Sequence, residues 1–136
     1  MPVVRISLSA QNPIPGRSIG DYVHQAMTET INIPDDDRFQ IISKHGSDEL
    51  LFDRSFYGVE RGDGFMVIDI TLAIGRSTAI KKKLYSRIVE LLSGKLDVNP
   101  GDVFISLNEI IPDNFSLGNG EAQFVDNPPP HLQALR

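Results

Sequence analysis

The alternation of hydrophobic and polar residues predicts four strands and two helices. Residues 3–9 alternate from Arg5 onward, which would place Val4, Ile6 and Leu8 on one face of a strand. Apolar side chains recur at helical spacing in two segments, 18–31 and 78–93, and Ser18 is the expected N-cap of the first helix. Further apolar runs typical of strands cover residues 38–44, 65–72 and 103–109.

The order of these elements predicts a duplicated β-α-β unit. Gly16-Arg17-Ser18 before the first helix recurs as Gly75-Arg76-Ser77 before the second, and Asp37-Arg38-Phe39 recurs loosely as Asp102-Val103-Phe104. A crossover helix makes the two strands of each unit parallel. The predicted fold is therefore α/β (α+β): a four-stranded sheet with both helices on one face. One domain spans 1–136, with repeat units over about 2–45 and 65–110 and a C-terminal tail, 111–136.

The remaining segments give weaker signals. Glycines punctuate the stretch from His45 to Gly64, which we expect to be a functional loop or lid with a short turn around 50–52. Pro128-Pro129-Pro130 predicts an extended, loosely held end. We expect Val4, Ile6, Ile68 and Ile70 to make the open face of the sheet apolar, so that another subunit covers it.

Composition narrows the possible functions. A net charge of −5 and a pI near 5.0 argue against nucleic acid as the partner, and the absence of cysteine excludes thiolate nucleophiles and cysteine metal sites. No charged leader or membrane-length apolar run stands out, so we expect a cytoplasmic protein that does not bind membranes. The histidines, His24, His45 and His131, are too scattered to form a ligand set, and no phosphate-binding loop is recognisable. We therefore expect no metal and no cofactor.

Pro2 is the most distinctive candidate for chemistry. Methionine is commonly trimmed before proline, and removal of Met1 would leave a prolyl amine at the start of the first strand. An α-amino group has an ordinary pKa of about 7.7–8.0, so modest electrostatic changes make it a proton donor or acceptor near neutral pH. If Met1 is retained, the Pro2 nitrogen is an amide and cannot titrate.

Several spaced motifs together resemble the tautomerase superfamily, and within it the malonate semialdehyde decarboxylase group. The resemblance spans residues 2 to about 126. It is carried by Pro2, by the segment from Pro34 to Gln40 with His45 beyond it, by the Gly75-Arg76-Ser77 turn, and by the segment from Asn114 to Phe124. It implies a homotrimer with active sites at the subunit contacts.

The resemblance also implies roles for four residues. Pro2 would be the general acid or base, Asp37 would orient or activate water, Arg76 would bind the substrate carboxylate, and Phe115 would form a wall of the pocket. Two positions depart from the family pattern: Ile74 replaces a first arginine, and Phe115 stands where a tryptophan is common. With fewer cationic anchors, the identity of the substrate is less certain than the type of reaction.

Other candidates have simpler interpretations. Without the motif, Asp37 belongs to a solvated acidic turn and Arg76 to an ordinary surface turn. We expect Arg17 to lie away from the site, His24 to be packed or capped, and Lys81-Lys82-Lys83 to be a solvated helix face.

The predicted activity is cofactor-independent chemistry on a small carboxylate-bearing oxo-acid. The leading hypothesis is a malonate semialdehyde decarboxylase-like lyase with a hydratase side activity. The alternatives are a keto-enol tautomerase of a phenylpyruvate-type substrate and a non-catalytic trimeric binding module. The protonation of Pro2 decides between the two enzymes, since nearby cations lower the pKa of an amine and a neighbouring carboxylate raises it.

Overall fold

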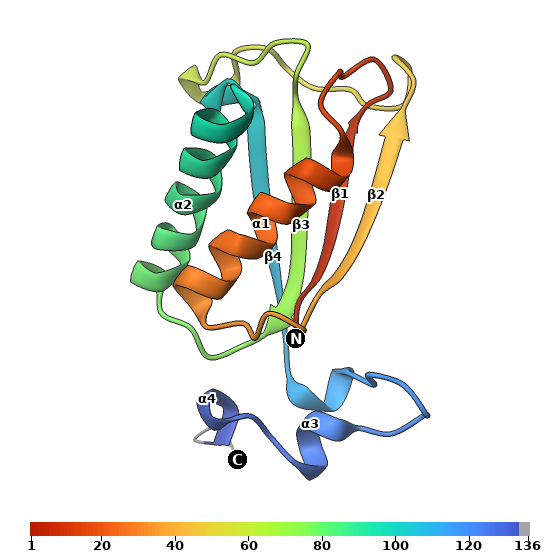
Figure 1. The fold of residues 1–136 in the computed structure, drawn as a ribbon, viewed down its shortest axis with the longest axis vertical. Coiled ribbons are helices and arrows are strands. Elements are labelled where there is room, and N and C mark those ends of the chain that lie inside the picture. The colour runs from red at the N-terminus through yellow and green to blue at the C-terminus, as the bar shows by residue number, and fades with distance from the viewer. Residues whose placement is uncertain (134–136) are drawn as a thin grey trace.

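The computed structural model describes residues 1–133 and shows a four-stranded mixed sheet with two long helices on one face (Figure 1). The strand order is β2-β1-β3-β4, with β1 parallel to β2, β3 parallel to β4, and β1 antiparallel to β3. The predicted α+β fold built from two β-α-β units is thereby confirmed. The main elements are β1 (Val3–Ser9), α1 (Gly16–Ile31), β2 (Phe39–His45), β3 (Met66–Ala73), α2 (Thr78–Leu96) and β4 (Val103–Ile110).

The hydrophobic core lies between the sheet and the helices. Val4, Ile6 and Leu8 share one face of β1, as predicted, and are fully buried in this core. Ile68 and Ile70 of β3 are buried there as well, opposite Ile6 and Val4 in the strand register. The expectation that these residues line the open face was wrong. Alternation shows which side chains share a face, but it does not show which face the helices cover.

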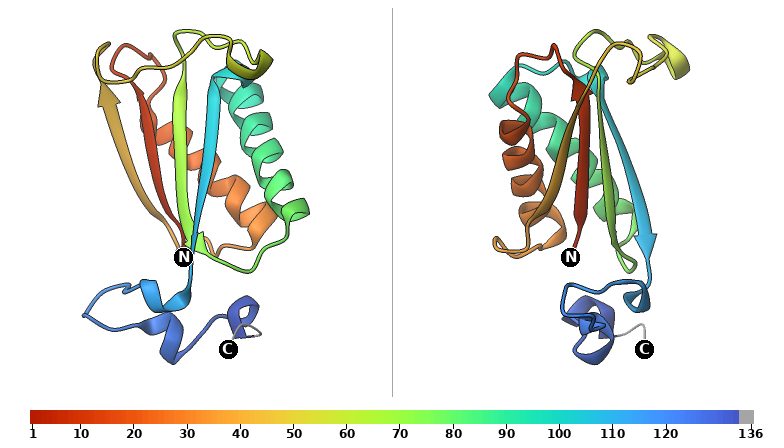
Figure 2. Two further views of the ribbon diagram at one scale, coloured as in Figure 1. Left: turned by 180° about the vertical axis from the view of Figure 1, so that it is seen from behind. Right: turned by 90° about the vertical axis from the view of Figure 1, so that its right-hand side faces the viewer.

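The open face carries the alternate residues of each strand. Phe39, Ile41 and Phe104 are 49%, 44% and 48% exposed on it, whereas the charged Arg5 and Asp69 lie opposite each other near its middle. Figure 2 shows this face of the sheet without a helix over it. An uncovered sheet face with large apolar side chains remains, although different residues form it from those that we predicted.

Both helices are longer than predicted. α1 begins at Gly16 after the extended residue Pro15, so Ser18 lies inside the first turn and is not the N-cap. α2 continues through Gly94 to Leu96 and ends where Asp97 adopts a left-handed conformation, whereas we expected it to end at 93. No helix within residues 1–133 has an apolar stretch long enough to cross a membrane.

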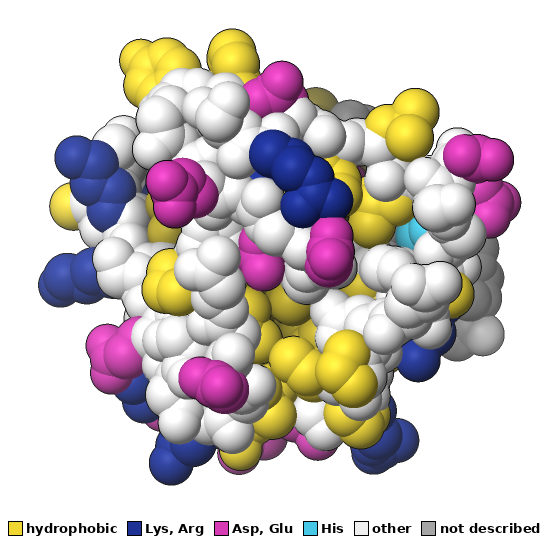
Figure 3. Space-filling model, turned by 90° about the horizontal axis from the view of Figure 1, so that it is seen from above, with side chains coloured by type: hydrophobic (Ala, Val, Ile, Leu, Met, Phe, Trp, Pro, Cys, Tyr) yellow, Lys and Arg dark blue, Asp and Glu magenta, His cyan; other side chains and the backbone are white. Residues whose placement is uncertain are grey.

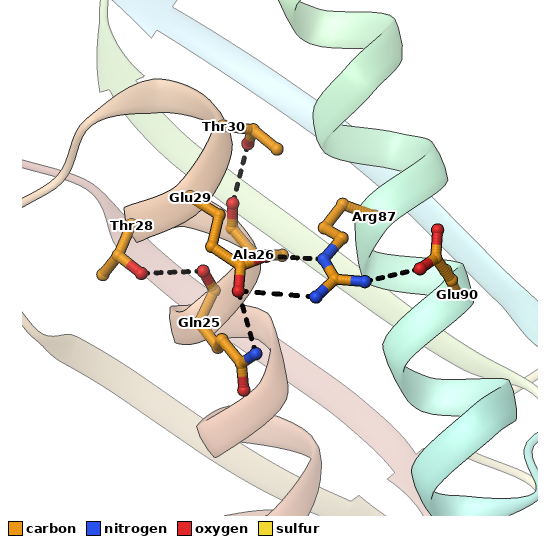
Figure 4. A network of polar contacts seen from close by, with 7 residues as sticks. All are labelled: Gln25, Ala26, Thr28, Glu29, Thr30, Arg87 and Glu90. Carbon is orange, nitrogen blue, oxygen red and sulfur yellow. Dashed lines mark hydrogen bonds and ion pairs between the residues drawn. The ribbon is translucent and has the colours of Figure 1, made fainter.

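One arginine ties the two helices together on their outer side. Arg87 of α2 binds Glu29 of α1, with Nε 2.5 Å from Oε2, and also Glu90 of its own helix (Figure 4). Gln25 donates a further hydrogen bond to Glu29. These contacts fix one helix against the other above the core.

The long loop and the C-terminal tail both carry more structure than the sequence indicated. A turn occupies residues 47–50 instead of 50–52, and Phe56–Gly58 forms a short 3-10 helix. The tail folds back as two short helices, α3 (Gln123–Asp126) and α4 (Pro130–Gln133), so the expectation of a loosely held end was wrong over the described residues. Burial of Leu132 and Phe115 explains this, because both side chains pack under the sheet. The last predicted tail residues, 134–136, lie outside the described part.

Candidate active site

The start of β1 brings an amine to a carboxylate. The Met1 amino nitrogen lies 3.0 Å from Asp37 Oδ2, and the two side chains are only 8% and 17% exposed. Asp37 is held in the turn before β2, where its N–H donates to the Pro34 carbonyl. Because β1 and β2 run parallel from this end, their first residues lie side by side. Pro2, the residue between Met1 and the start of β1, is buried.

Arg76 reaches the same end of the sheet from β3. Its turn is permitted by Gly75, whose φ of 124° is favoured by glycine. The half-buried guanidinium donates to the Ala73 carbonyl at 3.2 Å and, at 3.4 Å, to the Ile31 carbonyl at the end of α1. Burial lowers the pKa of Arg76, and the negative charges of Glu109 and Asp37 oppose that effect. The arginine remains a cation, with donors left for a further anion.

An apolar cluster of side chains lies beneath the amine, and the space that the Met1 side chain occupies against it is called the chamber below. The Met1 side chain packs against a cluster that the C-terminal tail completes, and the rings of Phe115 and Phe124 lie 5.8 Å apart within it. Figure 2 shows the tail directly below the N-terminus. The other members of this cluster are Ala73, Ile110 and Leu132. Met1 therefore fills a space walled by aromatic and aliphatic side chains, next to Asp37.

The four residues singled out from the sequence thus gather at one end of the sheet. Other candidates do not join them. His45 pairs with Ser9 at the far end of β1, and the exposed Arg17 starts α1 near that same end. His24 is packed, as expected, with Nε2 2.9 Å from the Asp35 carbonyl.

Two residues near the Arg76 turn, Glu109 and Lys81, were not predicted as part of the site. Glu109, close to the end of β4, acts electrostatically on Arg76 and accepts a hydrogen bond from Lys81 of α2 at 2.5 Å. The expectation that Lys81 belongs to a solvated face was therefore wrong, although Lys82 and Lys83 are exposed. Glu109 lies near the end of β4, and the adjacent strand, β3, leads to Arg76. This position was the signal in the sequence that could have identified Glu109.

The opposite end of the sheet holds the duplicate of this arrangement without an amine. Asp102 stands two residues before Phe104, as Asp37 does before Phe39. It is 5% exposed and accepts a hydrogen bond from the Gly62 N–H at 2.6 Å. Gly64 is needed here, since a Cβ at this residue would lie 2.8 Å from Asp102 Oδ2.

The same end also contains a cavity of about 470 Å³, lined by Asn12, Phe52, Arg54 and Phe65 among others. Figure 3, which looks onto this end, shows hydrophobic side chains around its edge with acidic and basic ones between them. Among the described residues that line this cavity there is no lysine and no chain terminus.

Comparisons with known proteins agree with the geometry. Residues 37–118 match a family model described as "Tautomerase enzyme". A protein of Bacillus subtilis (strain 168), described as probable tautomerase YusQ, is 37% identical over 127 residues, 93% of this chain and 100% of its own length.

Solved structures show the same fold. A malonate semialdehyde decarboxylase inhibited by 3-bromopropiolate is 32% identical with a TM-score of 0.83, covering 91% of this chain and 95% of its own. A fused 4-OT symmetric trimer, 17% identical, has a TM-score of 0.74 over 92% of this chain and 98% of its own, which shows a shared fold only. Since sequence and structure match along nearly all of its length, the chain belongs to the tautomerase family and resembles its malonate semialdehyde decarboxylase group.

Proposed function

We propose that this protein is a cofactor-independent enzyme that acts on a small oxo-acid through the amine of Pro2, once Met1 has been removed. The leading candidate reaction is a malonate semialdehyde decarboxylase-like cleavage, with hydration as a side activity. One observation carries the proposal: the terminal amine lies 3.0 Å from Asp37, at the sheet end that Arg76 also reaches. Removal of Met1 moves the amine by up to about 3.8 Å, the span of one peptide unit, so it stays at the same end of the sheet as Asp37.

Arg76 would bind and orient the substrate. Its described partners are two backbone carbonyls, so the planar guanidinium has N–H donors available for a carboxylate. Half-burial strengthens such a contact because less water competes for it. The proposed substrate, with a carboxylate two carbons from a carbonyl, would supply that anion.

Decarboxylation then requires one proton at carbon. The bond between the carboxylate carbon and its neighbour breaks, carbon dioxide leaves, and the electron pair enters the enolate of the remaining aldehyde. The protonated Pro2 amine donates its proton to the carbon that has lost the carboxylate, and the amine is then reprotonated from solvent. Asp37, which pairs with the terminal amine of Met1 in this structure, would accept a hydrogen bond from the Pro2 amine. In the hydratase side reaction, Asp37 would activate a water molecule.

The chamber that Met1 fills would become the substrate pocket. Its removal leaves an apolar space next to the amine, with Phe115 as one wall. Apolar walls reduce competition from water and strengthen charge contacts at the reacting carbon. The same chamber supports the alternative function, keto-enol tautomerisation of a phenylpyruvate-type substrate, because Phe115 and Phe124 could pack against a substrate ring. In that reaction the Pro2 amine is neutral and acts as the base.

We further propose that the protein is a homotrimer and works in the cytoplasm, as one domain over 1–136 with repeat units near 2–45 and 65–110. The open sheet face, with Phe39, Ile41 and Phe104 exposed, provides an apolar surface for subunit contact. The similar fused 4-OT protein is a symmetric trimer, which favours this number of subunits.

Purified protein would test the proposal after mass spectrometry has established whether Met1 is absent. Malonate semialdehyde, phenylpyruvate enol and a haloacrylate would be assayed in parallel. We expect turnover of malonate semialdehyde that Pro2→Ala and Arg76→Ala abolish while the oligomer stays intact. Full activity in both variants would refute the enzymatic proposal. Retention of Met1 in the native protein, with no turnover, would favour the non-catalytic trimeric binding module.

A further inference from the structure

Lys81 and Glu109 form an ion pair at the end of the sheet from which Arg76 extends. Glu109 is in register with Leu72, and the next residue on β4, Ile110, accepts a hydrogen bond from the Ile74 N–H at 3.0 Å. Arg76 itself binds the carbonyl of Ala73, which pairs with Ile110. Glu109 and Arg76 therefore approach the same end of the β3–β4 pair.

Glu109 is a natural competitor for the guanidinium. Of the two carboxylates that act electrostatically on Arg76, Glu109 has the larger effect and Asp37 the smaller. A carboxylate and a guanidinium that come within contact distance usually pair, because the flat fork of arginine matches the two carboxylate oxygens. Within residues 1–133, however, no ion pair joins Glu109 to Arg76.

Glu109 pairs with Lys81 instead. Its ammonium lies 2.5 Å from Glu109 Oε1, and the side chains of this pair are 23% and 28% exposed. Lys81 stands in the first turn of α2, five residues after Arg76, and its N–H donates to Ser77, the N-cap. The helix start that follows the Arg76 turn thus also positions the cation that occupies Glu109.

We infer that Lys81 is a positioning residue that keeps Arg76 free for the substrate carboxylate by holding Glu109 away from it. The inference rests on the proposed function, because it concerns how the same arginine binds its anion. Without the ammonium, Glu109 would be released toward Arg76 and would compete with any carboxylate ligand. The effect is on binding, since neither Lys81 nor Glu109 has a role in moving the proton.

Lys81→Met tests this because it keeps most of the aliphatic side chain and removes the charge. We expect KM for malonate semialdehyde to rise about fivefold, as for a partly exposed ion pair, with kcat changed less than about twofold. Lys81→Arg retains the pair with Glu109 and should behave like the wild type. The double variant Lys81→Met/Glu109→Gln removes the competitor as well and should restore the wild-type KM.

Lys82→Met is the matched control, since Lys82 is exposed on the same helical turn and makes the same change in net charge. An unchanged KM in Lys81→Met would overturn the inference, as would a loss in kcat alone. If Lys81→Met/Glu109→Gln has a KM as high as that of Lys81→Met, then Lys81 contacts the substrate directly. This result would also overturn the inference.

Equilibrium binding separates this inference from the proposed function. Malonate, used as an unreactive carboxylate probe, can be titrated into each variant by calorimetry whether or not the protein turns over any oxo-acid. If the wild-type protein binds malonate but does not turn over malonate semialdehyde, the proposed reaction is refuted. The order of the malonate Kd values among the four variants would still support or overturn the role of Lys81.

Discussion

Arg76→Met offers the sharpest test of how the site binds its substrate. The guanidinium is half-buried and donates hydrogen bonds to two backbone carbonyls, that of Ala73 at 3.2 Å and that of Ile31 at 3.4 Å. A bidentate carboxylate contact adds two charge-assisted hydrogen bonds, each worth about 1.5–3 kcal/mol. Partial exposure weakens them through solvent screening. We therefore expect a loss in transition-state binding of about 3–4 kcal/mol, or roughly 10²–10³ in kcat/KM at 1.4 kcal/mol per tenfold.

Steady-state kinetics with malonate semialdehyde would measure this loss, and two controls separate binding from folding. Arg76→Lys keeps the charge but lacks the planar fork, so it should retain an intermediate kcat/KM. The melting temperature should fall only slightly in both variants, because the lost backbone contacts are long. If both variants lost kcat/KM equally and melted at a much lower temperature, Arg76 would be a structural residue and the substrate-binding argument would be refuted.

Three further predictions concern the chamber, the core and the helix pair. Phe115→Ala should speed hydrogen exchange in the tail and reduce kcat/KM while exchange in the sheet is unchanged; unchanged tail exchange would contradict the packing described. Ile68→Ala, at a fully buried site, should cost about 3–4 kcal/mol of unfolding free energy in urea titrations, and a loss below about 1 kcal/mol would contradict the assigned core. Hydrogen bonds from Arg87, and then from Gln25, lower the pKa of Glu29 below its ordinary 4.5. The contribution of the Arg87–Glu29 ion pair to stability is therefore complete above pH 4.5, and it is lost as the pH falls through the pKa of Glu29 in the folded protein. Arg87→Met should lower the melting temperature at pH 7, and the difference from the wild type should shrink as the pH falls below 4.5; an equal drop at every pH would refute the ion pair.

Local patterns were sufficient to predict the elements of this fold. The alternation of Val4, Ile6 and Leu8 identified β1 with its observed limits, and the repeated Gly-Arg-Ser turns predicted the duplication. The sequence did not reveal which face the helices cover, because that depends on the direction of the crossover and not on alternation. It also suggested that α2 ends near Gly94, although a helix tolerates one glycine when its neighbours pack well.

The site was predictable only in part, for a similar reason. Pro2, Asp37, Arg76 and Phe115 belong to recognisable motifs, and the structure brings them to one end of the sheet. Lys81 and Glu109 are 28 residues apart and belong to no motif, so only the approach of α2 to β4 shows their relation. Leu132 escaped notice because a single leucine after three prolines has no periodicity, yet it is fully buried.

The buried carboxylate of Asp102 has a consequence for how this architecture could be re-engineered. Phe65 stands before β3 as Pro2 stands before β1, but its nitrogen is locked in a peptide bond, and the Gly62 N–H serves Asp102 instead. A circular permutant that opened the chain just before Phe65 would place a new terminus beside Asp102. That terminus would give the second half of the duplicated sheet an amine near its carboxylate, as Met1 gives the first half.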